Sequence, residues 1–143
     1  LRMLEHDIVF VTGPVEEPGL ESVVIREEPL FLYGPAGGDP TAGDWVLYPG
    51  SSRTRGVIDR YFVDEGFTPQ IILESANPAV LTQMVVLGFG WTILPEAVAE
   101  AGREPLTKHR AEPVAHRLMA AVWRASAAGN PRLAAFRTAA LAA

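Results

Sequence analysis

A short polar loop at residues 49–55, with the sequence PGSSRTR, is the part of this chain best suited to bind a ligand. Its small residues let a ligand approach the backbone, its hydroxyls can donate hydrogen bonds, and its two arginines carry positive charge. The candidate contacts in the loop are Gly50, Ser51, Ser52 and Thr54. A helix is expected directly after the loop, and the N-terminus of a helix attracts negative charge. The loop therefore favours a small anion as the ligand.

Two further loops place small polar residues after expected strands. Ser75 and Asn77 lie in the segment ESAN, directly before a helix, and Thr12 and Gly13 follow the first strand. In a parallel arrangement, the loops that follow the strands gather at one edge of the sheet. The unpaired N–H groups of the helix N-termini face the same edge. The three loops could therefore converge on one ligand.

Each candidate contact also has a purely structural explanation. A serine, threonine or asparagine before a helix commonly caps that helix. Ser52 or Thr54 could cap one helix, and Asn77, which is followed by Pro78, could cap the next. The arginines of the first loop could simply be solvated. The residue pattern alone leaves both explanations open.

The residues that usually perform catalysis or bind metals form no recognisable set. His6, His109 and His116 lack the spacing of helical zinc sites, and the chain has no cysteine. Ser51 and Ser52 are not in a G-x-S-x-G motif. The glycine patterns of P-loops and of dinucleotide-binding turns are absent as well. The sequence predicts no catalytic residue, no metal and no cofactor, and hence no enzyme.

Hydrophobic periodicity predicts alternating strands and helices around these loops. Strands are expected at residues 7–11, 45–48, 70–73 and 91–94, further extended segments at 21–33 and 117–124, and helices at 54–65, 78–87, 95–101 and from 131 onward. The first strand is expected to be buried on both faces, and Leu87 and the three tryptophans are expected in the core. The glycine-rich segment 34–43 is expected to be an exposed loop. Repeated strand–helix units predict an α/β fold with a parallel sheet.

Composition limits the class of protein further. The 143 residues are 48% hydrophobic and 20% charged, which is typical of a folded globular domain. The formal net charge of -5 disfavours DNA binding by this segment alone. No apolar run reaches the roughly 18 residues that a membrane span needs. Because no secretory signal is visible either, we expect a cytoplasmic protein that does not contact a membrane.

Two segments match a known family in their order and separation. They are PGSSRTRGVIDRYF, at residues 49–62, and LGFGWTILPE, at residues 87–96. The chain resembles the effector-binding domain of bacterial LysR-type transcriptional regulators in these segments and over essentially its whole length.

The resemblance implies an α/β fold of the type II periplasmic-binding-protein-like class. Two small Rossmann-like subdomains would be joined by two crossover strands. Residues 27–123 would form one nearly whole subdomain, and residues 1–26 and 124–143 would form part of the other, which would be incomplete. The family's helix-turn-helix domain would be absent from this segment, so that DNA would be bound only through that domain in the full-length protein.

The resemblance also implies a function. A small-molecule inducer, often a carboxylate or another small anion, would bind in the cleft between the subdomains and control transcription. By position, its contacts would be Thr12 and Gly13, residues 51–54 and residues 75–77, at the edge that the strand–helix pattern selects. Regulators of this family form homodimers and tetramers through the effector domain.

Two other classes of protein share the expected fold. A solute-binding protein of a transporter would normally carry an export signal. An enzyme acting on small carboxylates would need an acid or a base aimed into the cleft, where only Arg53, Arg55 and Glu74 are obvious charged residues. A winged helix-turn-helix encoded upstream would distinguish a regulator from both.

Overall fold

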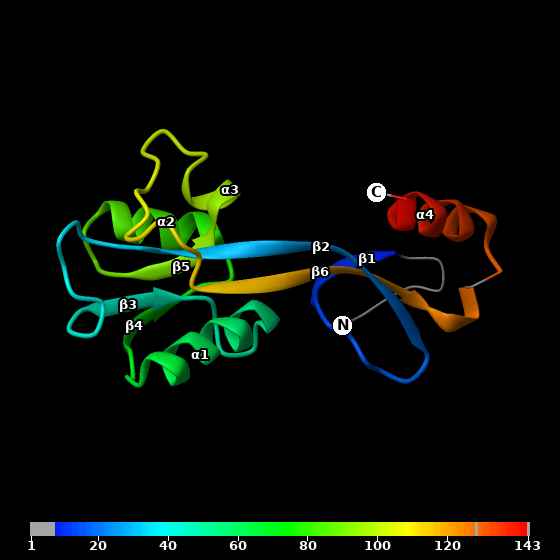
Figure 1. The fold of residues 1–143 in the computed structure, drawn as a ribbon, viewed down its shortest axis with the longest axis horizontal. Coiled ribbons are helices and arrows are strands. Elements are labelled where there is room, and N and C mark those ends of the chain that lie inside the picture. The colour runs from blue at the N-terminus through cyan, green and yellow to red at the C-terminus, as the bar shows by residue number, and fades with distance from the viewer. Residues whose placement is uncertain (1–7, 128, 143) are drawn as a thin grey trace. The chain divides into compact units, whose positions relative to one another are not determined.

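The computed structural model describes residues 8–127 and 129–142 (Figure 1). The chain divides into two compact units. Unit 1 combines Leu1–Glu28 with Arg117–Ala143, and unit 2 is the continuous segment Pro29–His116. The chain passes from one unit to the other within two strands, β2 (Leu20–Tyr33) and β6 (Ala115–Arg124). The boundaries expected from the sequence, after residues 26 and 123, fall within the same two strands.

Strands and helices follow one another along the described chain. In order, they are β1 (Val9–Gly13), β2 (Leu20–Tyr33), β3 (Asp44–Leu47), α1 (Arg53–Glu65), β4 (Gln70–Glu74), α2 (Pro78–Val86), β5 (Thr92–Pro95), α3 (Glu96–Ala99), β6 (Ala115–Arg124), a 3-10 turn (Ala125–Ala127) and α4 (Pro131–Ala142). Most predicted elements are confirmed within one or two residues, and the helix expected at 95–101 is shorter.

The strands of unit 2 are only partly parallel. β3 and β4 are parallel neighbours, and a parallel bridge between Trp45 and Trp91 links β3 to the residues that lead into β5. β5, however, pairs antiparallel with the last four residues of β2. The prediction of a wholly parallel sheet is therefore wrong for this pair. Strand alternation along the chain carries no information about the direction of a partner that is distant in sequence.

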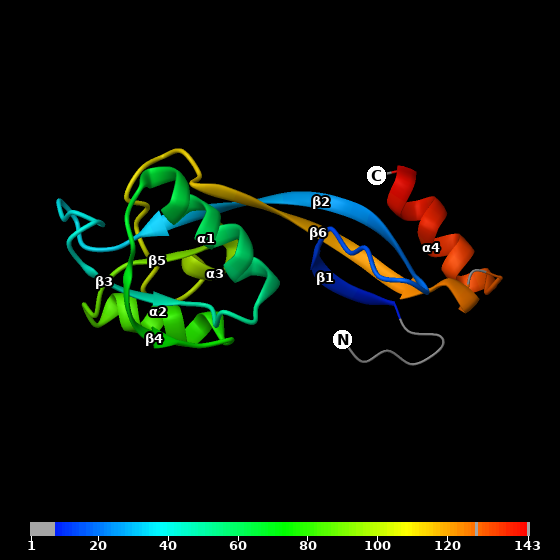
Figure 2. The same ribbon diagram turned by 90° about the horizontal axis from the view of Figure 1, so that it is seen from below.

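Helices α1 and α2 lie on opposite sides of the strands of unit 2 (Figures 1 and 2). α1 ends at Gly66, whose φ of 77° is one that glycine adopts readily. Its buried face includes Ile58, Tyr61 and Phe62, as the 3.6-residue periodicity predicts. Leu87 was expected in the core but is 59% exposed, because α2 ends one residue earlier and Leu87 is its C-cap.

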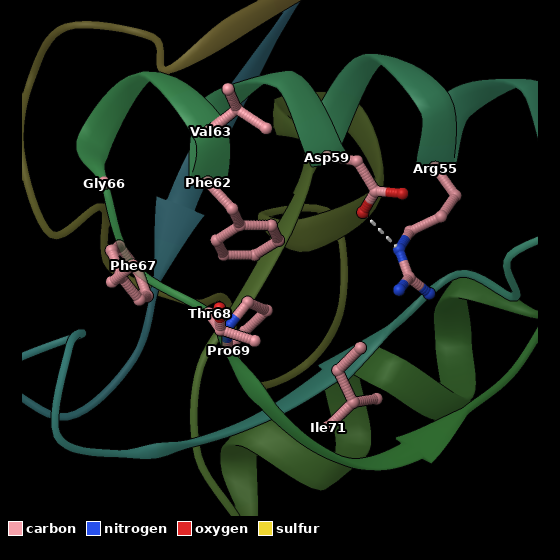
Figure 3. Close-up of a pocket in the computed structure, with 9 residues that line it drawn as sticks. All are labelled: Arg55, Asp59, Phe62, Val63, Gly66, Phe67, Thr68, Pro69 and Ile71. Atoms are coloured by element: carbon pink, nitrogen blue, oxygen red, sulfur yellow. Dashed lines mark hydrogen bonds and ion pairs between the residues drawn. The ribbon is translucent and has the colours of Figure 1, made fainter.

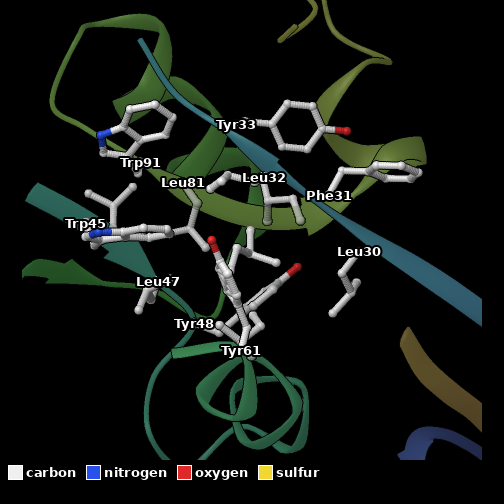
Figure 4. Packing of buried hydrophobic residues seen from close by; sticks show 14 of the residues in the cluster. Leu30, Phe31, Leu32, Tyr33, Trp45, Leu47, Tyr48, Tyr61, Leu81 and Trp91 are labelled. Carbon is white, nitrogen blue, oxygen red and sulfur yellow. The ribbon is translucent and has the colours of Figure 1, made fainter. Parts of the chain in front are cut away.

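Aromatic and branched side chains fill the space between these helices and strands (Figure 4). Trp45, from β3, is fully buried and meets the ring of Phe62 edge to face, with the ring centroids 4.9 Å apart. Leu81 is the buried residue of α2. The predicted core positions of Trp45, Trp91 and Trp123 are confirmed, since none of them is more than 2% exposed.

The indole ring of Trp91 packs directly against glycines of the 34–43 segment. A Cβ atom on Gly34 or Gly43 would overlap atoms of the ring, and one on Gly38 would lie 3.0 Å from it. The His109 ring covers another part of the indole, with the centroids 4.9 Å apart. The segment is a largely exposed loop, as expected, and its glycines also allow it to cover a buried tryptophan.

Unit 1 is built around β6, which lies between β1 and β2. β1 pairs antiparallel with β6, so that Val9 lies opposite Val122. Trp123 is 2% exposed, and its indole N–H donates to Glu21 Oε2 at 2.9 Å. Leu133, from α4, packs in the same cluster. A side chain from the last helix therefore completes the core of this unit.

The first strand is less buried than predicted. Phe10 is 58% exposed, although its ring meets that of Phe136 with the centroids 6.0 Å apart. β1 is the terminal strand in the described sheet order, and it has one strand neighbour rather than two. The continuous apolar run at residues 7–11 predicts a strand buried on both faces, and that prediction is wrong for Phe10.

Candidate functional site

The two polar loops of unit 2 lie next to each other because β3 and β4 are parallel and end together. Leu47 is opposite Glu74 in the pairing, and the Ser75 N–H donates to the Leu47 carbonyl oxygen at 3.0 Å. One loop leads into α1 and the other into α2. The predicted contacts brought to this edge are Gly50, Ser51, Ser52, Ser75 and Asn77.

Three of these side chains also hold the local backbone. Ser52 Oγ accepts from the Arg55 N–H at 3.4 Å, and Asn77 Oδ1 accepts from the Ala79 N–H at 3.0 Å. Ser75 Oγ accepts from the Asn77 N–H at 3.1 Å. These bonds use only the acceptor oxygens, whereas a hydroxyl and an amide NH₂ also have donor hydrogens. Capping a helix and donating to a ligand are therefore compatible at these residues.

The other predicted contacts in the first loop differ in how accessible they are. Ser51 is exposed, and within the described residues neither its amide nor its hydroxyl makes a hydrogen bond. Gly50 donates its N–H to Glu74 Oε2 at 2.9 Å. Thr54 is only 5% exposed. Ser51 is thus the best placed of these residues to donate to a molecule in solution.

The charges around this edge are arranged differently from the sequence-based expectation. Arg55 was expected to attract an anion, but its buried guanidinium pairs with Asp59 at 2.7 Å and with Glu74 at 3.3 Å. Its positive charge is therefore already compensated. The i, i+4 spacing of Arg55 and Asp59 was the sequence signal for this pairing. The helix N-termini remain favourable to an anion, because neither α1 nor α2 has an acidic residue in its first turn.

A pocket of about 490 Å³ lies beside α1 (Figure 3), and none of the predicted contacts lines it. It is lined by Arg55, Asp59, Phe62, Val63, Gly66, Phe67, Thr68, Pro69 and Ile71. Figure 3 shows the ion pair of Arg55 and Asp59 at one end and the Phe62 and Phe67 rings toward the other. Since the two charges neutralise each other, the pocket offers an apolar wall rather than a charged site.

Thr12 and Gly13 belong to unit 1, at the end of β1. Thr12 is 9% exposed, and a Cβ atom on Gly13 would lie 3.1 Å from the Ala120 Cβ. Their contact with a ligand stays a prediction.

Within 8–127 and 129–142, no group of three or more His, Cys, Asp or Glu residues could hold a metal ion. His6 lies outside that part of the chain. None of the helices described there is long and apolar enough to cross a membrane.

Solved structures share the fold of this chain. The regulatory domain of CcmR from Synechocystis PCC6803, in complex with 2-PG, matches with a TM-score of 0.74 at 21% identity, over 95% of this chain and 72% of that one. The effector-binding domain of QuiR, in complex with shikimate, matches with a TM-score of 0.72 at 20% identity, over 95% and 70% of the two chains. The fold is that of LysR effector-binding domains, the type II periplasmic-binding-protein-like fold, as the resemblance implied.

Curated relatives are longer proteins. YfeR of Shigella flexneri, an HTH-type transcriptional regulator, is 30% identical over 133 residues, which are 85% of this chain and 42% of that protein. CzcR of Bacillus cereus, also an HTH-type transcriptional regulator, is 24% identical over 102 residues, or 67% of this chain and 35% of that protein. This chain therefore spans less than half the length of either relative. The family model of the LysR substrate binding domain matches residues 1–143, so the chain belongs to the LysR substrate-binding domain family.

Proposed function

We propose that this chain is the inducer-sensing part of a cytoplasmic LysR-type transcriptional regulator and that it binds a small carboxylate or another small anion. The observation that carries the proposal is the adjacency of the two polar loops of unit 2. Between β3 and α1 lies the exposed Ser51, which makes no hydrogen bond to any described residue. Hydroxyl and amide donors close to helix N-termini without acidic residues favour a negatively charged group.

The relatives support the same class of function. The CcmR and QuiR domains hold 2-PG and shikimate, and shikimate is a small carboxylate. The curated relatives are named as HTH-type regulators, and this chain spans 35% of CzcR and 42% of YfeR. We therefore propose that DNA is bound through a helix-turn-helix domain outside the matched region, that the regulator acts as a homodimer or tetramer, and that this domain performs no catalysis.

The test is calorimetric titration of the chain with shikimate, 2-PG and a panel of other small mono- and dicarboxylates. Each hydrogen bond to a charged group contributes about 1.5–3 kcal/mol, so Ser51→Ala is expected to weaken binding by roughly 10- to 150-fold. Ser51 caps no helix among the described residues, and the melting temperature of this variant is therefore expected to stay the same. Ser126→Ala, which removes an exposed hydroxyl in unit 1, is the matched control.

A second variant separates capping from ligand binding. Ser52→Ala removes the N-cap of α1 and is expected to lower the stability by about 0.5–1 kcal/mol whether or not a ligand is present. Binding of no member of the panel, or equal affinity of Ser51→Ala and the unmodified chain, would contradict the proposed site.

A further inference from the structure

Arg55 connects three separate parts of unit 2. Its side chain is only 10% exposed. The three acceptors of its hydrogen bonds come from three different segments of the chain. Nε donates to Asp59 Oδ1 at 2.7 Å, and Nη1 donates to the Tyr48 carbonyl oxygen at 2.8 Å and to Glu74 Oε2 at 3.3 Å. The guanidinium thereby joins α1, the loop after β3 and the end of β4. A planar group with donors in fixed directions suits this role, whereas a lysine ammonium does not.

Glu74 extends this network to the backbone of the candidate ligand loop. Its Oε2 accepts from the Gly50 N–H at 2.9 Å as well as from Arg55. The loop is therefore fixed at the Tyr48 carbonyl and at the Gly50 amide, directly before Ser51. Since the Glu74 side chain is 44% exposed, its ion pair with Arg55 is screened by water and contributes little to the stability of the whole domain. The main effect of Glu74 is therefore on the position of the loop backbone at Gly50.

We propose that Glu74, oriented by Arg55, is a positioning residue that holds the loop so that Ser51 faces the ligand. This inference rests on the function proposed above. A carboxylate next to an anion repels it, so a direct electrostatic effect of Glu74 would oppose binding. A positioning effect, acting through Gly50, would favour binding. The two effects have opposite signs and can be separated by two substitutions of the same residue.

The first measurement is hydrogen exchange of the Gly50 amide, which needs no ligand. Glu74→Ala removes the acceptor and is expected to speed exchange at Gly50 by about tenfold, while amides of β5 exchange as before. Glu74→Gln removes the charge but keeps an acceptor oxygen, and is expected to change the rate by less than about threefold. The control is Asp64→Asn, which removes an exposed ion pair between Arg60 and Asp64 within α1. This variant is expected to leave the exchange rate of the Gly50 amide unchanged.

The second measurement is the affinity of each variant for shikimate as the probe. Glu74→Ala is expected to bind about fivefold more weakly than the unmodified chain, because the loop loses its preorganised position. Glu74→Gln is expected to bind as tightly or more tightly, because a negative charge is gone while the loop is still held.

The outcomes distinguish the two proposals. Equal affinities of Glu74→Ala and Glu74→Gln, or Gly50 exchange in Glu74→Ala within about twofold of the unmodified chain, would overturn the positioning role. If neither shikimate nor any other member of the carboxylate panel binds the unmodified chain, the proposed function fails, and the exchange rates at Gly50 alone then decide whether Glu74 holds the loop.

Discussion

Replacing Gly34 with alanine tests whether the 34–43 segment is fitted to the Trp91 ring. An added Cβ atom would overlap ring atoms, and one of these, Cζ3, would lie only 2.6 Å away. The ring has little room to retreat, because Trp91 is 2% exposed and lies against the rings of Trp45 and His109. Either the indole or the backbone of the loop must therefore move.

The loss of folding stability expected for Gly34→Ala is at the upper end of the range for overpacked cores. Inserting a methyl group into a well-packed core costs about 1–3 kcal/mol, and we expect about 3 kcal/mol here because several ring atoms are overlapped. For a chain of this length, each kcal/mol corresponds to roughly 2–4 °C, so the melting temperature should fall by about 6–12 °C. Thermal unfolding followed by circular dichroism, together with urea titration, measures both quantities.

Two further variants make this test specific. Gly50→Ala is the matched control, since a Cβ atom there would meet nothing within 4 Å, and its stability is expected to stay within about 0.5 kcal/mol. In a Trp91→Leu background the ring is gone, and Gly34→Ala should then cost less than about 1 kcal/mol. A Gly34→Ala variant that melts within about 2 °C of the unmodified chain would refute the packing argument.

The remaining predictions concern a helix, a buried phenol and DNA. Gly56→Ala, at an exposed position of α1 with open space around it, should raise the stability by about 1 kcal/mol in the same unfolding assay, and a loss of stability would contradict this. Burial, reinforced by a hydrogen bond to Glu100, raises the pKa of Tyr33, so the domain should lose stability as the pH rises past about 10, where the unfolded phenol ionises. Melting curves between about pH 8 and 11 should show a shallower loss for Tyr33→Phe, and parallel curves would refute the assignment. With a net charge of -5, the chain alone should give no operator-specific gel shift at physiological salt, and a salt-sensitive specific shift would show the opposite.

Local signals in the sequence predicted the helices well. Ser52 and Gly66 mark the ends of α1, and Asn77 followed by proline marks the start of α2, because capping depends on residues only a few positions apart. The adjacency of the two polar loops of unit 2 was predicted as well, since it requires only that β3 and β4 be parallel.

Features that depend on distant partners were not predictable in the same way. The antiparallel pairing of β5 with β2 and the exposure of Phe10 both depend on which strands become neighbours. The role of Glu74 depends on a glycine 24 positions away along the chain. Arg55 was expected only to add positive charge to the loop, and its i, i+4 spacing to Asp59 is visible in the sequence, whereas its contact with Glu74 forms only in the folded unit.

The division of the chain into two units has a consequence for the order of folding during synthesis. Unit 2 is one continuous segment, so its contacts can form as soon as His116 has left the ribosome. Unit 1 is made from two segments that flank unit 2, and the pairing of Val9 with Val122 closes a loop that contains all of unit 2. Such non-local pairing is slow because the entropy of loop closure is lost before contacts compensate for it. The pairing of β1 with β6 can therefore form only after the whole of unit 2 has been synthesised.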